Sequence, residues 1–264
     1  MTEAASQFAR DLAASRSRRQ ALGLLGTAIG GTVLTACGSR ANGQGSAQCL
    51  ATPAEIAGPF PADGTQGRGG INVLDKVGIL RSDIRSSFAG LEGTAEGVPL
   101  DLEIALVGTA GGGCAPLAGW AVYLWQNDAR GEYSLYTLPE ANYLRGLQQS
   151  GDGGTLRFRT IVPGCYGGRY PHIHFEVFSS AEAAISGEPG LLVSQFALPA
   201  AECRAVYAAD QQYGDSLRNL ERLPITRDFV FRDASAEVLA LQTIALEDDR
   251  TGGFRGKATV GLAY

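Results

Sequence analysis

The sequence predicts an all-β protein, a β-sandwich with short helical insertions, and three observations support this. Short apolar runs with period-two alternation recur from residue 49 onward. Turn-forming residues separate the runs, since the chain holds 36 glycines and 11 prolines. A hydrophobic fraction of 45% and a charged fraction of 19% suit one sizeable core. Short strands at this spacing are typical of two packed sheets.

The clearest strand contains Leu100, Leu102, Ile104 and Leu106, which alternate with mostly polar neighbours. The segment 200–210 is the best helix candidate, whereas 217–223 is too short to assign. Further strands are expected over residues 121–125, 155–161, 172–177, 191–198, 229–231, 238–246 and 258–262.

Residues 1–36 resemble an export signal. Arg18 and Arg19 precede an apolar stretch of about sixteen residues, which is short for a membrane span of roughly 20 residues. Paired arginines before a weakly apolar stretch are typical of a twin-arginine signal. The alternative is a weak N-terminal anchor that stays attached.

The signal ends in Leu-Thr-Ala-Cys, which resembles a bacterial lipobox with Cys37 as the lipidated residue. Residues 37–48 lack apolar periodicity and are expected to form a flexible tether. Residues 49–264 are then a single domain. We expect it outside the cytoplasmic membrane, anchored by lipid at the cell surface or in the periplasm.

Four further cysteines suggest two disulfides, because their number is even and the domain is expected to be exported. Three pairings are possible, of which we favour Cys49 with Cys114 and Cys165 with Cys203. A four-thiolate zinc site competes with this interpretation. It is weaker, because no two of these cysteines lie close in sequence.

The chain contains two histidines, His172 and His174, which lie two positions apart. Alternate residues of a strand share one face, so both imidazoles can point to one place. Imidazole is the commonest metal-ligating side chain, although two hydrogen-bonded structural histidines would give the same spacing. Glu176 shares that face and could complete an Fe(II) site. Such sites take their second histidine from a distant element, and this chain has none.

Four motifs surround these histidines, and together they carry a specific resemblance. They span Thr52 to Phe60, Trp125 to Tyr133, Phe158 to Tyr166 and Arg169 to His174. In these motifs the chain resembles the intradiol ring-cleavage dioxygenases, which include the catechol 1,2- and protocatechuate 3,4-dioxygenases. The similarity covers residues 49–195 and is nearest to the exported, single-domain branch.

The resemblance implies a non-haem Fe(III) site with Tyr133, Tyr166, His172 and His174 as ligands. Phenolates are hard, anionic donors that favour Fe(III) over Fe(II). Tyr166 would be the ligand that leaves when a catechol chelates the iron through both oxygens. The implied reaction cleaves the ring between the two hydroxyl-bearing carbons with O2 and gives a muconate-type diacid.

Other positions carry implied roles at the same pocket. Arg169 would stabilise negative charge on the bound ring, and Gln195 matches a pocket glutamine. Gly58 and Pro59 would line the pocket mouth. Gly167 would contact substrate, and because several relatives carry proline or tryptophan there, we expect a more open entrance.

The expected partners are a small aromatic diol and O2, with a homodimer as an additional expectation. Nucleic acid is not expected, because the net charge is −5 and no Lys/Arg-rich stretch lies beyond the first twenty residues. Membrane contact is expected only through the N-terminal lipid. The rival function is a non-catalytic exported sandwich that binds aromatics or glycans at the cell surface.

Overall fold

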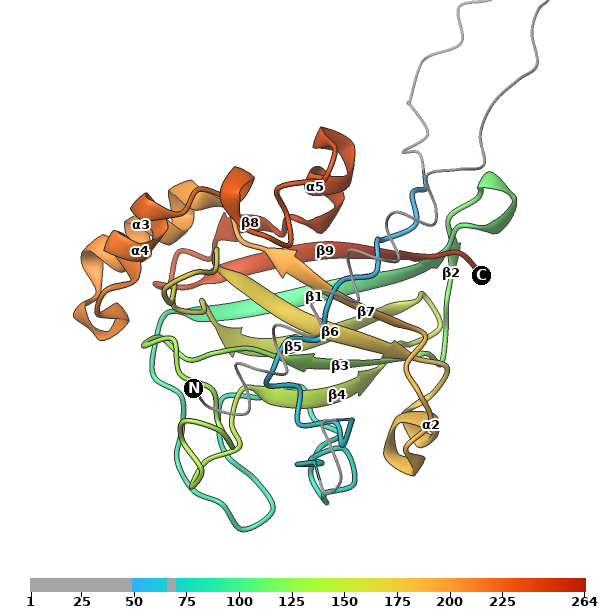
Figure 1. Ribbon diagram of the computed structural model, residues 1–264. Helices are drawn as coiled ribbons and strands as arrows, with labels where there is room; N and C mark the ends of the chain where they lie inside the picture. Colours follow the sequence, from blue (N-terminus) through green and yellow to red (C-terminus); the bar gives the residue numbers. More distant parts are fainter. Residues whose placement is uncertain (1–48, 66–69) are drawn as a thin grey trace, which may run out of the picture. The chain divides into compact units, whose positions relative to one another are not determined.

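Two β-sheets packed face to face form the body of the domain, as the sequence predicts (Figure 1). The computed structural model describes residues 49–65 and 70–264. The predicted export signal, the tether and Cys37 lie outside the described residues. No helix within the described residues is long and apolar enough to span a bilayer.

The first sheet has five strands, and β1 lies in its interior. Its members are β1 (Pro99–Gly108), β2 (Ala115–Pro116), β5 (Thr155–Ile161), β8 (Ala245–Asp248) and β9 (Phe254–Leu262). One edge of β1 pairs with β2 and β5, and the other pairs with β9. The β1–β9 pairing is parallel, whereas the other pairings in this sheet are antiparallel.

The second sheet has four antiparallel strands in the order β4-β3-β6-β7. They are β3 (Ala121–Trp125), β4 (Arg145–Gln149), β6 (His172–Phe178) and β7 (Leu192–Ala197). Because β6 lies inside this sheet, its register fixes which side chains neighbour the two histidines.

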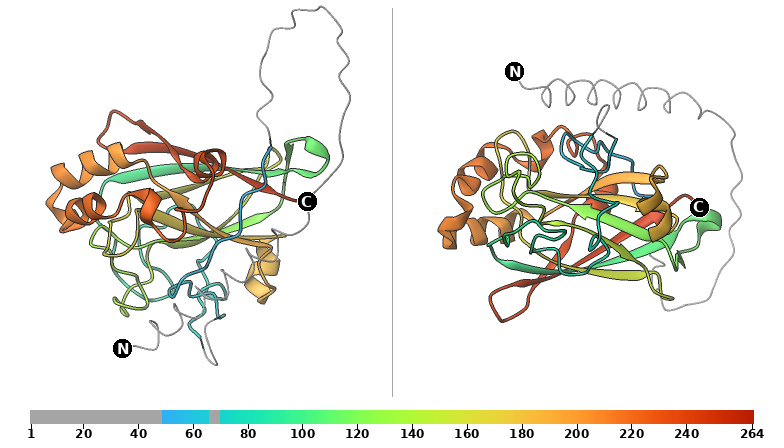
Figure 2. Two further views of the ribbon diagram at one scale, coloured as in Figure 1. Left: turned by 45° about the horizontal axis from the view of Figure 1, so that its top comes forward. Right: turned by 90° about the horizontal axis from the view of Figure 1, so that it is seen from below.

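Short helices lie outside the two sheets (Figure 2). In Figure 1, α3 and α4 lie together at one end of the sandwich, and α2 lies at the other. The α-helices are α2 (Ala181–Ser186), α3 (Ala200–Ala209), α4 (Ser216–Arg222) and α5 (Ala236–Gln242); the 3-10 turns are η2 (Ala110–Gly112), η3 (Gln211–Tyr213) and η4 (Ile225–Arg227).

The main apolar core lies between the sheets, where alternate residues of each strand point inward. A second apolar cluster covers the outer face of the four-stranded sheet, where Val73, Leu74 and Ile79 join Tyr123 and Trp125. Both faces of β6 are therefore covered, and all seven of its residues are buried. Large members of the main core are Leu100, Leu102, Phe158, Phe175, Phe196 and Val260.

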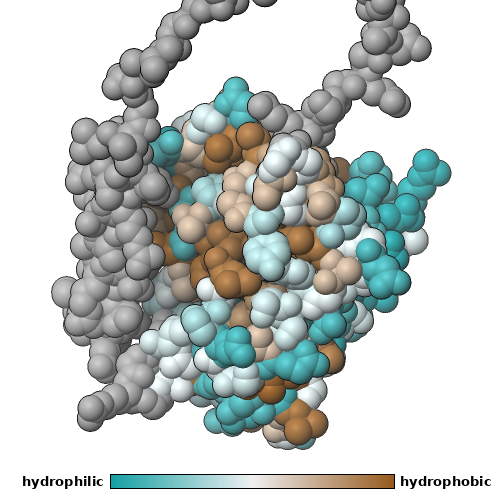
Figure 3. All heavy atoms as spheres, turned by 90° about the vertical axis from the view of Figure 1, so that its right-hand side faces the viewer, coloured by the Kyte–Doolittle hydropathy of each residue, from teal (hydrophilic) through white to brown (hydrophobic). Residues whose placement is uncertain are grey.

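Apolar residues also reach the surface. On the face shown in Figure 3 they gather near the middle and are bordered by hydrophilic residues. Among the described residues, the large apolar side chains with most exposure are Val77, Leu191 and Tyr264.

Two predicted strands are wrong. Residues 229–231 form a turn, because the Asp228 carboxylate accepts a hydrogen bond from the backbone N–H of Val230. Most of 238–246 belongs to α5, where the Ser235 side chain caps the helix by accepting from Val238 N. Good helix formers follow that cap, so local propensity outweighs the apolar pattern.

One of the two favoured disulfides is confirmed, since Cys49 is bonded to Cys114. The other is wrong, because Cys165 and Cys203 are free and buried. The Cys165 thiol points to the carbonyl oxygen of Arg169 at 3.5 Å. The Cys203 thiol is instead hydrogen-bonded to the Tyr207 hydroxyl.

Candidate metal centre

The alternation of β6 directs its two histidines to the outer face of the four-stranded sheet. Ile173 and Phe175 point into the main core, so His172 and His174 point the other way. Both imidazoles are buried, with 1% and 3% of their surface exposed. The register places Trp125 opposite His174, and their rings stack with centroids 5.0 Å apart.

Three donor atoms converge at this face. The Nε2 atoms of His172 and His174 lie 3.0 Å apart. The Tyr133 hydroxyl oxygen lies 3.5 Å from His172 Nε2 and 3.2 Å from His174 Nε2. Two ring nitrogens and a phenol oxygen therefore face one point, as ligands of a single cation would.

Both imidazoles are neutral and present acceptor nitrogens. Burial, with the Arg169 guanidinium nearby, holds the pKa of His172 well below 6.5. Burial and the neighbouring His172 lower the pKa of His174 in the same way. His172 Nδ1 donates to the Tyr170 carbonyl oxygen at 2.6 Å, which makes Nε2 the acceptor nitrogen that faces the centre and the Arg169 guanidinium. Within the described residues, His174 Nδ1 has no hydrogen-bond partner.

Tyr166 completes the group of ring side chains. Its ring centroid lies 6.0 Å from that of Tyr133 and 5.8 Å from that of His172. Burial raises the pKa of Tyr166, and the Arg169 charge opposes that shift. Burial also raises the pKa of Tyr133, well above 10. Without a cation both phenols keep their protons, so a strongly charged metal ion is what would convert them to phenolates.

Glycines allow close contact between the loop that carries Tyr133 and the loop that carries Tyr166. Gly131 has a φ of 85°, and a Cβ there would lie 2.8 Å from the Cβ of Tyr166. A Cβ on Gly164 would collide with the backbone of Ala129 in the other loop. Asn127 Nδ2 also donates to the Gly164 carbonyl oxygen at 2.9 Å. Close backbone contact therefore fixes where both phenols lie.

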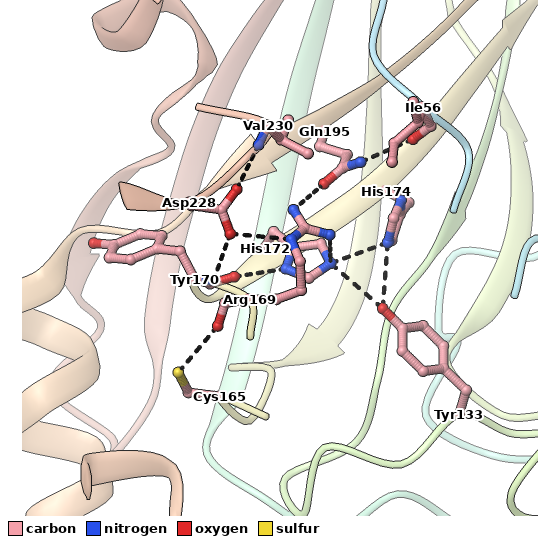
Figure 4. A network of polar contacts seen from close by, with 10 residues as sticks. All are labelled: Ile56, Tyr133, Cys165, Arg169, Tyr170, His172, His174, Gln195, Asp228 and Val230. Carbon is pink, nitrogen blue, oxygen red and sulfur yellow. Dashed lines mark hydrogen bonds and ion pairs between the residues drawn. The ribbon is translucent and has the colours of Figure 1, made fainter. Parts of the chain in front are cut away.

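Arg169 lies beside the histidines and is held on three sides (Figure 4). Its Nε donates to Asp228 Oδ2 at 3.0 Å, and its Nη2 donates to Gln195 Oε1 at 2.6 Å. Its Nη1 lies 3.0 Å from His172 Nε2. Arg169 therefore lies beside His172, and Gln195 lies in contact with Arg169.

The segment before the first sheet closes one side of the centre. Gln195 Nε2 donates to the Ile56 carbonyl oxygen at 2.8 Å. A Cβ on Gly58 would lie 3.3 Å from Cε1 of His174, so this backbone lies directly against the imidazole. Pro59 follows in the same segment and is half-buried.

Gly167 lies at the exposed edge of the centre. No heavy atom lies within 4 Å of the Cβ that a side chain would add at Gly167 or Gly168. The loop after Tyr166 therefore has space for a side chain at both positions, and the open entrance stays a prediction.

The alternative Fe(II) site with Glu176 does not form. Among the described residues, no group of three His, Cys, Asp or Glu side chains is placed to hold a metal ion. Glu176 packs against Gly190 instead, and burial raises the pKa of its carboxyl to about 7.

Sequence reasoning missed Asp228 and Arg145. Asp228 is fully buried against Arg169, but a single aspartate in an aperiodic segment gave no signal. Arg145 is also fully buried, and it holds the backbone beside Tyr133 through the Ser134 hydroxyl and carbonyl. Phe60 packs on Tyr133 with ring centroids 4.6 Å apart. It lies within the Thr52–Phe60 motif and could have been found from the sequence.

Comparison with solved structures identifies the fold. An intradiol ring-cleavage dioxygenase from Tetranychus urticae matches with a TM-score of 0.54 and 23% identity, over 69% of this chain and 86% of that chain. A second Tetranychus dioxygenase matches with a TM-score of 0.59 and 21% identity, over 81% and 94%. No protein-family model and no curated protein matches the chain. The chain therefore has the fold of the intradiol ring-cleavage dioxygenases.

Proposed function

We propose that the protein is a non-haem Fe(III) dioxygenase that cleaves catechol-type aromatics between their two hydroxyl-bearing carbons. The convergence of Tyr133 Oη with Nε2 of His172 and His174 is the observation that carries this proposal. Two neutral imidazoles with two phenols form a donor set of the hardness that suits a ferric ion. The product would be a muconate-type diacid.

Four residues would hold the iron: Tyr133, Tyr166, His172 and His174. When bound, the ferric ion supplies a Lewis acid that holds both catechol oxygens and activates the ring towards O2. Tyr166 is the half-exposed member of the set, whereas the other three are buried. Tyr166 would therefore be the member of the set with most room to move, and its phenol oxygen could hold a proton released by the substrate.

Arg169 and Gln195 would orient the substrate. The Arg169 guanidinium lies beside His172 and has a preorganised direction, so it stabilises negative charge on the bound ring without rearranging. Gln195 holds one edge of that guanidinium and also ties down the segment before Gly58. Gly58, Pro59 and Gly167 would border the entrance.

The purified protein tests this proposal by its colour. Tyrosinate-to-iron charge transfer should make the iron-loaded protein red to burgundy, and Tyr166→Phe should bleach or shift the band. Tyr170→Phe is the matched control, because its hydroxyl bonds to the Leu198 carbonyl oxygen and its ring lies outside the donor set. A colourless protein with full iron loading would contradict the proposal.

Turnover is tested by oxygen uptake with a panel of catechols and identification of the products. Muconate-type products support intradiol cleavage. Yellow semialdehyde products would show that the ring opens outside the two hydroxyl-bearing carbons and would overturn the assignment.

We also propose that the protein is exported and anchored by lipid through Cys37, on the strength of the Arg18-Arg19 pair and the lipobox-like segment. Its partners would be the aromatic diol and O2, and a homodimer stays a prediction. Mass spectrometry of the membrane fraction should find a lipid on Cys37, and an unmodified cysteine there would refute the anchor.

A further inference from the structure

Asp228 lies at the centre of the polar network around the candidate metal centre (Figure 4). It follows η4, in a segment with no predicted role, and its side chain is fully buried. A buried carboxylate is costly unless donors surround it. Three donors do so here: Oδ2 accepts from Arg169 Nε at 3.0 Å and Tyr170 N at 2.8 Å, and Oδ1 accepts from Val230 N at 2.9 Å.

One oxygen of this carboxylate therefore holds two parts of the centre. Through Arg169 it fixes the guanidinium beside His172. Through the backbone N–H of Tyr170 it holds the residue whose carbonyl oxygen accepts from His172 Nδ1. A shift of Asp228 would move the arginine and the support of the imidazole together.

The direction of the Arg169 guanidinium depends on this contact. Asp228 accepts from Nε and Gln195 accepts from Nη2. The Phe229 ring covers one face of the guanidinium, with its centroid 4.8 Å from Cζ. Nη1 is thereby turned towards His172. Among the described residues, Asp228 is the acidic side chain that forms an ion pair with Arg169, and both partners are buried.

We propose that Asp228 is a positioning residue for the ring-cleavage reaction, acting through Arg169. It aims the guanidinium at the substrate position and neutralises that charge while the pocket is empty. The proposal rests on the proposed function, since it presupposes a bound aromatic diol. Asp228 itself contacts neither the donor atoms nor the substrate position.

Four proteins test the proposal: the wild type, Asp228→Asn, Arg169→Gln and the double variant. Asp228→Asn should lower kcat/KM about tenfold to a hundredfold, the range seen when a residue that orients a site is removed. In the Arg169→Gln background the same change should have little further effect, because the group that Asp228 aims is gone. If the fold-losses in kcat/KM of the two single variants multiply in the double variant, the proposal is overturned.

A second measurement needs no iron. In the metal-free wild type the Arg169 Nε–H should give a slowly exchanging NMR signal, because it donates to a buried carboxylate. This signal should be lost in Asp228→Asn. Asp249→Asn is the matched control: Asp249 also accepts backbone N–H bonds, in the β8–β9 loop, and should leave the signal and kcat/KM unchanged. A signal that survives in Asp228→Asn would contradict the geometry.

Folding failure is distinguishable from lost positioning. Asp228→Asn leaves a buried arginine without its anion, whereas the double variant removes both charges and should melt at a higher temperature. Asp228→Glu keeps the charge and should recover part of kcat/KM if Asp228→Asn does not fold. A colourless, inactive wild type would overturn the proposed function and this role together, whereas an active wild type with multiplying losses would overturn this role alone.

Discussion

Two buried thiols, Cys165 and Cys203, lie near the candidate centre without forming a disulfide. Burial raises the pKa of each to about 12. The thiolate is the reactive form, so at pH 8 both side chains should resist alkylation by iodoacetamide while the protein is folded. Mass spectrometry should find both modified after unfolding. Rapid modification of either cysteine in the native protein would contradict their burial.

The same pKa values set the direction of a pH effect on stability. An unfolded thiol titrates near 9.0, whereas the folded ones titrate near 12. Above pH 9 the unfolded state therefore binds fewer protons than the folded state, and the free energy of unfolding falls as pH rises. Replacing Cys165 and Cys203 by alanine should flatten this fall.

Part of the candidate metal centre could be predicted from the sequence. The spacing of His172 and His174 predicted two imidazoles on one strand face, and the family resemblance added Tyr133. The structure brings these three side chains together. Asp228 could not be foreseen, because its role depends on a segment that returns from beyond β7 to meet Arg169. Contacts of that kind have no local signature in the sequence.

Gly146 on β4 shows how one element is fitted to its neighbours. A Cβ there would collide with the Cγ2 atom of Ile84. Gly146→Ala should therefore lower the free energy of unfolding by about 1–3 kcal/mol, the usual cost of overpacking. Gly153→Ala is the control, because open space surrounds that position and it should change stability little. Equal denaturation midpoints for the two variants would contradict this packing.

Strands with an apolar run or with alternating apolar residues could be predicted, and the expected ranges of β3 and β5 coincide with the observed ones. β4 was not predicted, because it begins with a buried arginine and Gly146 and has no alternation. The residues of α5 were predicted as a strand from their leucines and valine, whereas the Ser235 side chain caps a helix there. Tertiary contacts and capping decide such segments, and an apolar pattern does not report them.

At the scale of the whole molecule, the Cys49–Cys114 disulfide ties the start of the described domain to the loop before β2. It spans 65 positions. Restricting an unfolded chain over that length stabilises the folded state by about 4 kcal/mol in the loop-entropy model. Replacing both cysteines by serine should lower the melting temperature, and a reductant should have no further effect on that variant. Unchanged melting would argue against the bond.

The parallel pairing of β9 with β1 has a consequence for how the chain folds. Their partners lie about 150 positions apart, and contacts of such long range slow folding because the intervening chain must be ordered first. Among the described strands, β9 is also the last to be synthesised. Until it docks, β1 keeps one edge without a partner, and an open edge of this kind invites association with other chains. Completion of this sheet therefore depends on β9, and we expect the chain to be more prone to aggregation while β9 is not paired with β1.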